Sequence, residues 1–373
     1  MKLFKVLCVV GTRPEAIKMA PVIYQLKNSP HFDTRIIATA QHRELLDGIH
    51  DFFGITPDID LDIMSENQTL TGLTSRLLDR MSEVLTSEAP DAVLSQGDTT
   101  TVMVTGLACF YAKIPFGHVE AGLRTHDLYN PFPEEFNRVI VGRLAKWHFA
   151  PTESSRRNLI TDGISDDAIY VTGNTVIDAL EIAKGRLKNS GIKTQSTDSK
   201  TVLITCHRRE NFGEPFLRIC KAIYLLARNN PNITFIYAVH PNPNVHRIAH
   251  EELGAEDNIV LRDPMQYQDF IAEMLRCHLI LTDSGGVQEE APALGKPVLV
   301  LREETERPEA VDLGVVKLVG TETENIVLSA QNLIDSEESY ARMAKGISPY
   351  GDGLASTRIV KVLTDYLGEV LGA

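Results

Sequence analysis

Short runs of Val, Ile and Leu alternate along this chain with longer segments of helical periodicity, and this alternation constrains the fold more than any other feature. Runs of this kind are typical of parallel strands that are buried on both faces and joined by helices. In the first half we expect strands at residues 5–10, 34–40, 92–96, 115–119 and 147–150, and helices at 15–28, 44–53 and 70–87. In the second half we expect strands at residues 201–205, 233–238, 259–262, 279–282, 297–301 and 316–318. The pattern predicts an α/β protein with doubly wound parallel sheets.

The length of 373 residues indicates two domains, since a domain usually holds about 150 residues. The polar segment 188–200, with the sequence KNSGIKTQSTDSK, has no periodicity and is typical of a linker or an exposed loop. We expect one domain at residues 1–178 and a second at 179–373, with the final helix, 355–371, able to pack back on the first domain. Doubly wound domains bind ligands beyond the carboxyl ends of their strands, so the expected active site is a cleft between the two domains.

The composition excludes several classes of protein. A net charge of −13 argues against a nucleic-acid-binding protein, which usually presents a basic face. No apolar run approaches the roughly 20 residues of a membrane span, and the apolar start is too short for a signal peptide. The cysteines have no CxxC spacing, which argues against a metal site and against disulfides; they are Cys8, Cys109, Cys206, Cys220 and Cys277. We therefore expect a cytoplasmic protein with reduced thiols, no metal, and no nucleic-acid or membrane partner.

The segment VVGTRPEAIKMAP, residues 9–21, leads from the first expected strand into a helix. Thr12 is placed to cap this helix, and Pro14 fits its first turn. Arg13 and Lys18 lie near the helix N-terminus, where backbone N–H groups and the helix dipole favour a bound anion. An ordinary strand-to-helix turn with solvated charges is the alternative interpretation.

Three carboxylates occupy expected loop or helix-start positions in the first half. Asp98 follows one strand in SQGDTTT, and Glu120 follows the next strand in GHVEAGLR. Glu134 lies at a helix start in NPFPEEFNR, where Pro133 fits the first turn and Arg138 follows one turn later. Taken singly, Asp98 fits a helix cap and Glu134 fits a salt bridge with Arg138. Because the loops of a doubly wound sheet converge, we expect the carboxylates to share one site, where crowded carboxyl groups suit acid/base chemistry.

In the second half, residue types suited to a diphosphate follow the expected strands. His207 lies in TCHRREN, and residues 284–286, with the sequence SGG, open a helix. Backbone N–H groups at such a helix start bind phosphate, and Glu290 further along suits a pair of sugar hydroxyls. Together with Arg13 and Arg307, these groups form a candidate diphosphate cradle.

Several nucleotide-binding and hydrolase motifs are absent from the sequence. No GxGxxG follows the first strand, no GxxxxGK[ST] P-loop occurs, and no GxSxG elbow is present. His118 and His240 have no metal-ligand partner at short spacing, and we interpret them as packing or polar histidines. The sequence therefore does not support NAD binding, P-loop chemistry or an α/β-hydrolase triad.

Across essentially its whole length, the chain resembles the non-hydrolysing UDP-N-acetylglucosamine 2-epimerases. The resemblance rests on motifs in matching order, including GTRPEAIKMAP, QGDTTT, GHVEAGLRT, PFPEEFNR, VTGNTVIDAL, HRREN, TDSGGVQEEAPALGKPVLVLRE, TERPEAV and PYGDG. It implies a GT-B-like pair of Rossmann-type domains and a homodimer. It also implies the interconversion of UDP-N-acetylglucosamine and UDP-N-acetylmannosamine without an added cofactor.

The resemblance further implies roles for individual residues. The positions that match the family's catalytic residues are Lys18, Asp98, Glu120, Glu134, Arg138 and His207. The positions that match its substrate-binding residues are Arg13, His207, Phe270, Ser284, Gly285, Gly286, Glu290 and Arg307. In some bacterial members a second substrate molecule activates the enzyme, through positions that match Gln41, His42, Arg208, Arg209 and His240. The chain departs from many relatives at Cys206 and Met265.

The reaction implied by the resemblance eliminates UDP to a glycal intermediate and adds it back, with carboxyl groups as acid and base on opposite faces of the sugar. A hydrolysing epimerase, which releases UDP and N-acetylmannosamine, is the nearest alternative. A GT-B glycosyltransferase is another, although its common Glu-x7-Glu spacing is absent because Pro297 and Val298 stand where the second Glu would fall. A nucleotide-sugar sensor without catalysis is the third.

Overall fold

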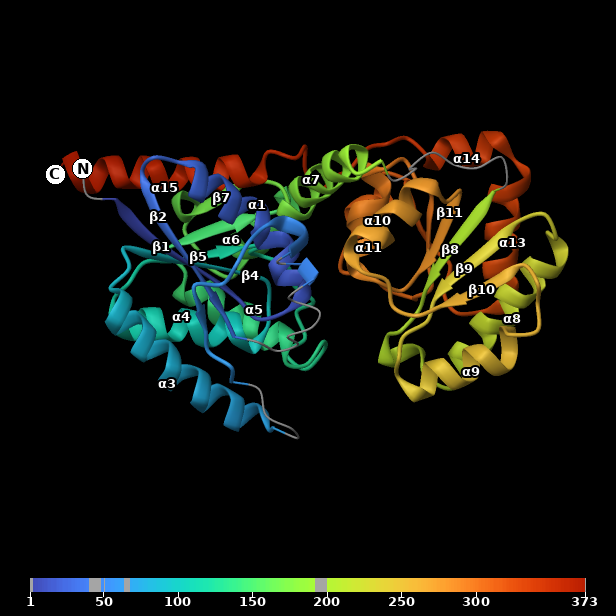
Figure 1. Ribbon diagram of the computed structural model, residues 1–373, viewed down its shortest axis with the longest axis horizontal. Coiled ribbons are helices and arrows are strands. Elements are labelled where there is room, and N and C mark those ends of the chain that lie inside the picture. The colour runs from blue at the N-terminus through green and yellow to red at the C-terminus, as the bar shows by residue number, and fades with distance from the viewer. Residues whose placement is uncertain (1–2, 40–47, 50, 64–67, 192–199, 373) are drawn as a thin grey trace. The chain divides into compact units, whose positions relative to one another are not determined.

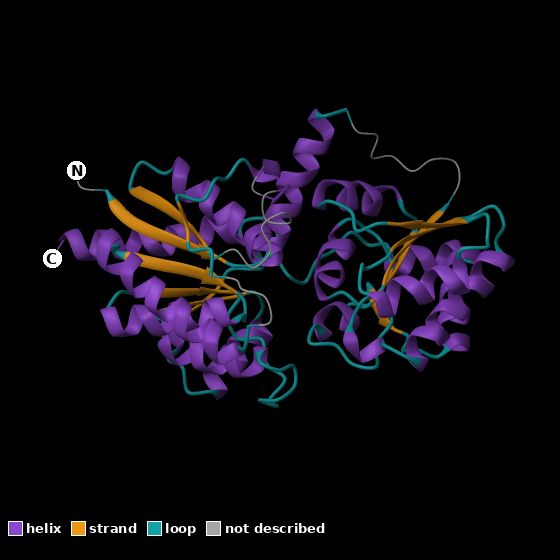
Figure 2. Ribbon diagram, turned by 60° about the horizontal axis from the view of Figure 1, so that its bottom comes forward, coloured by secondary structure: helices purple, strands orange, loops and turns teal. Residues whose placement is uncertain are grey.

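The structure, a computed structural model, describes residues 3–39, 48–49, 51–63, 68–191 and 200–372. The chain forms two compact units, of which the first comprises Met1–Ile182 and Tyr350–Ala373 and the second comprises Ala183–Pro349. In each unit a parallel sheet lies between layers of helices (Figures 1 and 2). The boundary expected at residues 178 and 179 falls within helix α7 (Thr175–Asn189).

The sheet of the first unit is parallel throughout, with the strand order β3-β2-β1-β4-β5-β6-β7. Its central strands are nearly continuous apolar runs, as expected for strands covered on both faces. The expected strands at 92–96 and 147–150 are confirmed residue for residue. Two short outer strands, β3 and β7, were not predicted, because two or three residues are too few to show a periodic pattern. The strands are β1 (Phe4–Val10), β2 (Phe32–Ala38), β3 (Ile59–Asp60), β4 (Ala92–Gln96), β5 (Phe116–Val119), β6 (Trp147–Ala150) and β7 (Ile169–Val171).

Helices cover both faces of this sheet. On one face α3, α4 and α5 pack side by side, and their apolar residues form one core with Leu7 and Val9 of β1. On the other face α15 lies along α1 (Figure 1). The helices of the unit, besides α7, are α1 (Arg13–Asn28), α3 (Leu70–Glu88), α4 (Thr100–Ala112), α5 (Glu134–Leu144), α6 (Glu153–Thr161), the 3-10 turn η1 (Asp166–Ala168) and α15 (Ala355–Gly372).

The final helix, α15, belongs to the first unit for two physical reasons. The Tyr366 ring packs edge-on against Trp147, with ring centroids 5.0 Å apart, and Lys146 Nζ lies 3.8 Å from the centroid of the same tyrosine ring. The buried Asp178 carboxylate accepts the Ser356 backbone N–H at 2.8 Å and the Ser356 hydroxyl at 2.6 Å. A carboxylate at this position satisfies donors at the helix start that have no partner within the helix.

The second unit repeats the architecture with the strand order β10-β9-β8-β11-β12-β13. Helices α8, α9 and α13 contribute apolar residues to one core, which includes the fully buried Tyr237. The strands are β8 (Thr201–Thr205), β9 (Thr234–Ala238), β10 (Ile259–Arg262), β11 (Leu279–Thr282), β12 (Val298–Val300) and β13 (Val316–Leu318). The helices are η2 (Arg209–Asn211), α8 (Glu214–Asn229), α9 (Pro243–Leu253), α10 (Tyr267–Arg276), α11 (Gly285–Ala293), α12 (Pro308–Asp312), α13 (Thr323–Asp335) and α14 (Glu337–Met343).

Two expected segments lie partly or mainly outside the described residues: the helix at 44–53 and the linker at 188–200. Among the helices that the structure describes, none is long and apolar enough to cross a membrane. The described ranges also contain no group of His, Cys, Asp and Glu side chains arranged to hold a metal ion.

Candidate functional site

In each sheet the strand order reverses at one place, between β1 and β4 in the first unit and between β8 and β11 in the second. Ligands of doubly wound sheets bind beyond the carboxyl ends of the strands at such a reversal. Arg13 and Asp98 follow the two strands at the first reversal, and Glu120 follows the neighbouring β5. His207 and the start of α11 follow the two strands at the second. The fold therefore places the predicted residues where this architecture binds ligands.

The start of α1 is held by a reciprocal cap. Thr12 accepts the Glu15 backbone N–H, and the Glu15 carboxylate accepts the N–H groups of Gly11 at 2.6 Å and Thr12 at 3.1 Å. The hydroxyl of Thr99, at the start of α4, donates to the same carboxylate at 2.6 Å. Burial raises the pKa of Glu15 to about 7. We did not single out Glu15, although the Thr-x-x-Glu spacing of the capping box was visible in the sequence.

The half-buried Arg13 is the first residue of α1, as expected for an anion site. Gly11 directly follows β1. A Cβ at this position would lie 2.6 Å from the hydroxyl oxygens of both Thr39 and Thr101, so the glycine is required by close packing at the end of β1.

Lys18 and Glu120, two of the predicted catalytic residues, form a buried ion pair. Lys18 Nζ lies 2.7 Å from each oxygen of the Glu120 carboxylate. Gln96 Nε2 and Asn174 Nδ2 also donate to this carboxylate, the latter at 3.2 Å. Glu120 adopts a left-handed backbone conformation, with φ of +66°. Strain of this kind is costly for a residue with a side chain and is concentrated at functional sites.

Asp98 and Arg138 form a second pair between predicted residues. The Asp98 carboxylate accepts hydrogen bonds from Arg138 Nη2 at 2.7 Å and Nε at 2.9 Å, and Arg138 Nη1 donates to the buried Glu135 at 3.0 Å. The alternative interpretation of Glu134 as a salt-bridge partner of Arg138 is therefore wrong, because the guanidinium donates to Asp98 and Glu135. The suggestion that Asp98 caps α4 is also wrong, since Thr99 caps that helix.

Glu134 is half-buried at the first position of α5, and Pro133 is the N-cap of that helix rather than a residue of its first turn. No described residue donates a hydrogen bond to the Glu134 carboxylate or forms an ion pair with it. A carboxylate in the first turn is favoured by the helix dipole. Unlike Asp98 and Glu120, Glu134 therefore has no hydrogen-bond or ion-pair partner among the described residues.

His118 lies inside the first unit, as its interpretation as a packing residue predicted. Its Nε2 lies 2.7 Å from the Gly97 carbonyl oxygen. Burial lowers the pKa of His118 to about 4, and burial likewise lowers the pKa of His148 to about 4. Both imidazoles are therefore neutral at physiological pH.

These neutral histidines predict a loss of stability in weak acid. Each takes up a proton near pH 6.5 when unfolded but only near pH 4 when folded, so its contribution is complete above pH 6.5 and falls as the pH decreases toward 4. Glu15 acts in the opposite direction between pH 7 and 4.5, because the folded protein binds its proton first. The effect of the two histidines on stability exceeds that of this single carboxyl group. We therefore expect the urea concentration at the unfolding midpoint to decrease as the pH is lowered from 6.5 to 5.

A matched variant tests this prediction. His118→Gln keeps a donor for the Gly97 carbonyl but removes the titration, so its urea midpoint is expected to fall less steeply over the same pH range. Parallel curves for the parent chain and the variant would show that His118 does not carry this pH dependence.

In the second unit, the carboxylate of Asp283 organises the loop that carries His207. Asp283 Oδ2 accepts the backbone N–H groups of His207 and Arg208, both at 2.9 Å, and the side-chain amide of Asn211 at 3.0 Å. Asp283 Oδ1 lies 3.4 Å from His207 Nδ1. The His207 ring is exposed and stacks on His240, with ring centroids 5.5 Å apart. The departure at Cys206 is tolerated because its thiol is buried and donates to Asp283 at 3.2 Å.

At the start of α11 the backbone lies close to the Arg307 side chain, and no described side chain caps the helix. Ser284 is the N-cap without a side-chain capping bond, so its hydroxyl does not satisfy the backbone N–H groups of the first turn. Arg307 lies against Gly285, where a Cβ would be 2.7 Å from the guanidinium, and Arg307 Nε donates to Glu289 at 2.6 Å. The start of α11 and the Arg307 guanidinium, two parts of the predicted diphosphate cradle, thus lie side by side. Glu289 orients Arg307, and we did not predict this partner.

The other predicted binding residues of this unit lie near the same helix. The buried Glu290 carboxylate accepts the Tyr267 hydroxyl at 2.9 Å, and the half-buried Phe270 follows one turn later on α10. Met265 is half-buried just before α10.

Of the positions that suggested a second, activating ligand, Gln41 and His42 lie outside the described residues. Arg208 Nη1 lies 3.9 Å from Glu306, and Arg209 opens η2. Although burial opposes it, hydrogen bonds and charge from Arg302 lower the pKa of Glu306 to about 2. With its ring stacked on His207, His240 is next to a predicted catalytic residue.

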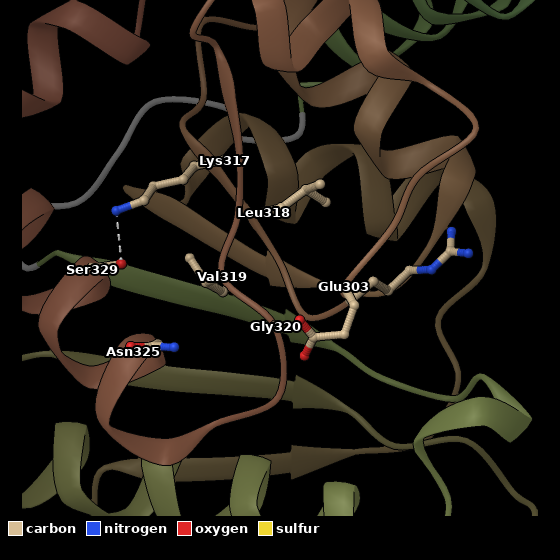
Figure 3. A pocket seen from close by; sticks show the side chains of 8 residues that line it. Glu303, Lys317, Leu318, Val319, Gly320, Asn325 and Ser329 are labelled. Atoms are coloured by element: carbon tan, nitrogen blue, oxygen red, sulfur yellow. Dashed lines mark hydrogen bonds between the residues drawn. The ribbon is translucent and has the colours of Figure 1, made fainter.

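A pocket of about 350 Å³ lies elsewhere in the second unit, between β13, the start of α13 and the chain after β12 (Figure 3). Lys317 Nζ donates to Ser329 Oγ at 3.0 Å at one end, and the Glu303 carboxylate points toward Gly320 at the other. None of the residues predicted for catalysis or substrate binding lines it.

Comparison with known proteins supplies the chemical context of this geometry. The family described as UDP-N-acetylglucosamine 2-epimerase matches residues 24–364. The UDP-N-acetylglucosamine 2-epimerase of Salmonella typhimurium is 50% identical over 371 residues, which cover 97% of this chain and 99% of that protein. The crystal structure of UDP-GlcNAc 2-epimerase from Neisseria meningitidis bound to UDP-GlcNAc is 49% identical, with a TM-score of 0.93 over 97% of this chain and 100% of that one. The Methanocaldococcus jannaschii enzyme in complex with UDP-GlcNAc and UDP is 33% identical, with a TM-score of 0.82 over 97% and 99% of the two chains.

Proposed function

This chain belongs to the UDP-N-acetylglucosamine 2-epimerase family, and we propose that it catalyses the reversible epimerisation of UDP-N-acetylglucosamine at carbon 2 to UDP-N-acetylmannosamine. The fold, two doubly wound Rossmann-type sheets, is GT-B-like, as the resemblance implied. The observation that carries the proposal within this chain is the pair of cation–carboxylate contacts, Lys18 with Glu120 and Arg138 with Asp98, at the ligand-binding edge of the first sheet.

Carbon 2 of the sugar has no carbonyl neighbour, so its proton is not acidic in the resting substrate. The proposed reaction therefore begins with cleavage of the bond between carbon 1 and the UDP oxygen, and the electron pair leaves with UDP. Loss of the carbon 2 proton to a carboxylate then gives a glycal. In the return step the UDP oxygen bonds to carbon 1 while a carboxyl group delivers a proton to the other face of carbon 2.

The first unit supplies the acid and base in this proposal. Asp98, Glu120 and Glu134 are the carboxyl groups, and Lys18 and Arg138 hold two of them in a fixed orientation. The second unit supplies the groups that hold UDP. His207, the start of α11 and Arg307 stabilise the charge of the departing diphosphate, with Arg13 as a further cation. Glu290 and Phe270 complete the UDP-binding set.

Three further properties belong to the same proposal. The reaction needs no cofactor, because the substrate supplies its own leaving group and its own proton. The location is cytoplasmic, which the free and buried cysteines support. The assembly is a homodimer, supported by the exposed rings of Phe110 and Tyr111 at the end of α4, since aromatic surface of this kind is enriched at interfaces. Sedimentation equilibrium tests the dimer directly.

The close packing at the start of α11 gives a test of UDP binding. Gly285→Ala places a methyl group 2.7 Å from the Arg307 guanidinium, which must then move away, and we expect the affinity for UDP to fall by about 10-fold or more. Gly368→Ala on α15 is the matched control, because its Cβ would meet no atom within 4 Å. Equal UDP dissociation constants for both variants, measured by calorimetry, would remove Arg307 from the cradle.

The reaction itself is tested by incubating the protein with UDP-N-acetylglucosamine and separating the products. We expect an equilibrium mixture with UDP-N-acetylmannosamine and little free UDP. Free UDP with N-acetylmannosamine would identify a hydrolysing epimerase. Unchanged substrate in the presence of folded protein would contradict the proposal and favour a transferase that lacks its acceptor.

A further inference from the structure

The Glu120 carboxylate is surrounded by hydrogen-bond donors from three different elements. Lys18 Nζ on α1 contacts both of its oxygens at 2.7 Å. Gln96 Nε2 at the end of β4 donates to Oε2, and Asn174 Nδ2 just before α7 donates to Oε1 at 3.2 Å. His118 on β5, on whose pKa the Glu120 charge acts, is neutral. Two of the donors are therefore uncharged amides to which the resemblance assigns no role.

The orientation of the Asn174 amide is fixed by its own surroundings. Its Oδ1 accepts the Val176 backbone N–H at 3.1 Å at the start of α7, as an N-cap side chain does. Its backbone N–H donates to the Tyr350 carbonyl at 2.5 Å, and the whole residue is buried. Since the oxygen is occupied by the helix start, the amide N–H group faces Glu120 and cannot exchange places with the oxygen.

The Gln96 amide differs in one respect. Its Oε1 is buried, and no described residue donates to it. The backbone is fixed, because Gln96 is paired in register with Val119, the residue before Glu120. A buried acceptor without a donor is costly, and an amide offers a donor and an acceptor that exchange places on rotation about its last bond. Gln96 can therefore donate to an ionised Glu120 or accept from a protonated one.

We propose that Gln96 and Asn174 are positioning residues for epimerisation, acting through Glu120. Asn174 holds one carboxylate oxygen in a fixed direction. Gln96 donates to the other oxygen while Glu120 is ionised and, after its amide rotates, accepts the O–H when Glu120 carries the sugar's proton. On the Glu120 side of the sugar the proton passes from carbon 2 to Glu120 Oε2, and neither amide gains or loses a proton. This inference rests on the proposed function.

Asn174→Asp tests the first role. Aspartate keeps the oxygen that caps α7 but replaces the donor to Glu120 with a second carboxylate, and a like charge makes Glu120 easier to protonate. We expect kcat at pH 7 to fall by about 10- to 100-fold, and the acid limb of the kcat profile to move to higher pH. The matched control is Asn158→Asp, which removes a hydrogen bond of the same type, 2.9 Å long, to the Gly122 carbonyl. The control is expected to lower the melting temperature without moving the acid limb.

Gln96→Met tests the second role, and it remains an independent test of the inference if the Asn174→Asp variant does not fold. Methionine has similar length but neither donor nor acceptor, and we expect kcat to fall by about 10- to 100-fold while KM and the UDP dissociation constant change by less than about threefold. An acid limb that moves equally in Asn174→Asp and Asn158→Asp, or a Gln96→Met kcat close to the parent value, would overturn the inference. A parent protein that does not epimerise the substrate would instead overturn the proposed function.

Discussion

Glu120→Gln is expected to lower kcat for epimerisation by about 10³-fold while UDP still binds, because general acid–base groups contribute factors of this size. The variant removes a proton acceptor. It also places an amide NH₂ among donors only, since Lys18, Gln96 and Asn174 all direct N–H groups at this position. The measurement is the initial rate of UDP-N-acetylmannosamine formation, with UDP titration by calorimetry as the test that the binding groups of the second unit remain intact.

Glu369→Gln on the exposed face of α15 is the matched control, and its kcat is expected to equal that of the parent chain. Asp98→Asn and Glu134→Gln extend the test to the other two carboxyl groups, with the same expected pattern of retained UDP binding and lost turnover. Near-normal rates in all three carboxyl variants would remove the acid/base assignment altogether.

Lys18→Met is expected to destabilise the first unit by about 3–5 kcal/mol, the cost of breaking a buried ion pair on one side. Both partners are almost fully buried, so water does not replace the lost ammonium group. Trp147 is the single tryptophan of the chain and lies buried in β6, so its fluorescence reports unfolding of this unit in urea. Turnover is expected to be lost as well, since Glu120 loses its cation.

The double variant Lys18→Met, Glu120→Gln identifies the source of the effect. It removes the uncompensated charge, so its stability is expected to exceed that of Lys18→Met although it carries one more substitution. Lys361→Met is the surface control, because its pair with Asp365 is exposed and such pairs contribute less than about 1 kcal/mol. If Lys18→Met is no less stable than Lys361→Met, the buried pair does not hold Glu120 as described.

The hydrophobic runs predicted the central strands well because those strands are buried on both faces and contain few polar residues. The same signal failed for β3 and β7, which have two and three residues, respectively. The candidate site residues were predicted from a topological rule: in parallel sheets, loops that follow neighbouring strands meet at one edge. This rule predicts which loops meet but not which side chains contact one another.

Arg138 illustrates that limit. Local helical spacing favoured Glu134 as its partner, whereas Asp98, forty positions earlier in the chain, receives two of its hydrogen bonds. The partners of Glu120 were missed for the same reason: Gln96 and Asn174 are 24 and 54 positions away, and uncharged amides give no charge pattern to follow. In the second unit, Asp283 directly precedes the recognised SGG segment. Its carboxylate nevertheless binds the His207 loop, which follows the neighbouring strand β8.

The central claim is that carbon 2 loses and regains a proton by way of an eliminated intermediate. Proton NMR of the protein with UDP-N-acetylglucosamine in heavy water, without acceptor or cofactor, tests it most directly. The account predicts UDP-N-acetylmannosamine that carries deuterium at carbon 2, because the proton taken by the carboxylate exchanges with solvent before another is returned. Epimerised product that retains its original hydrogen at carbon 2 would contradict it.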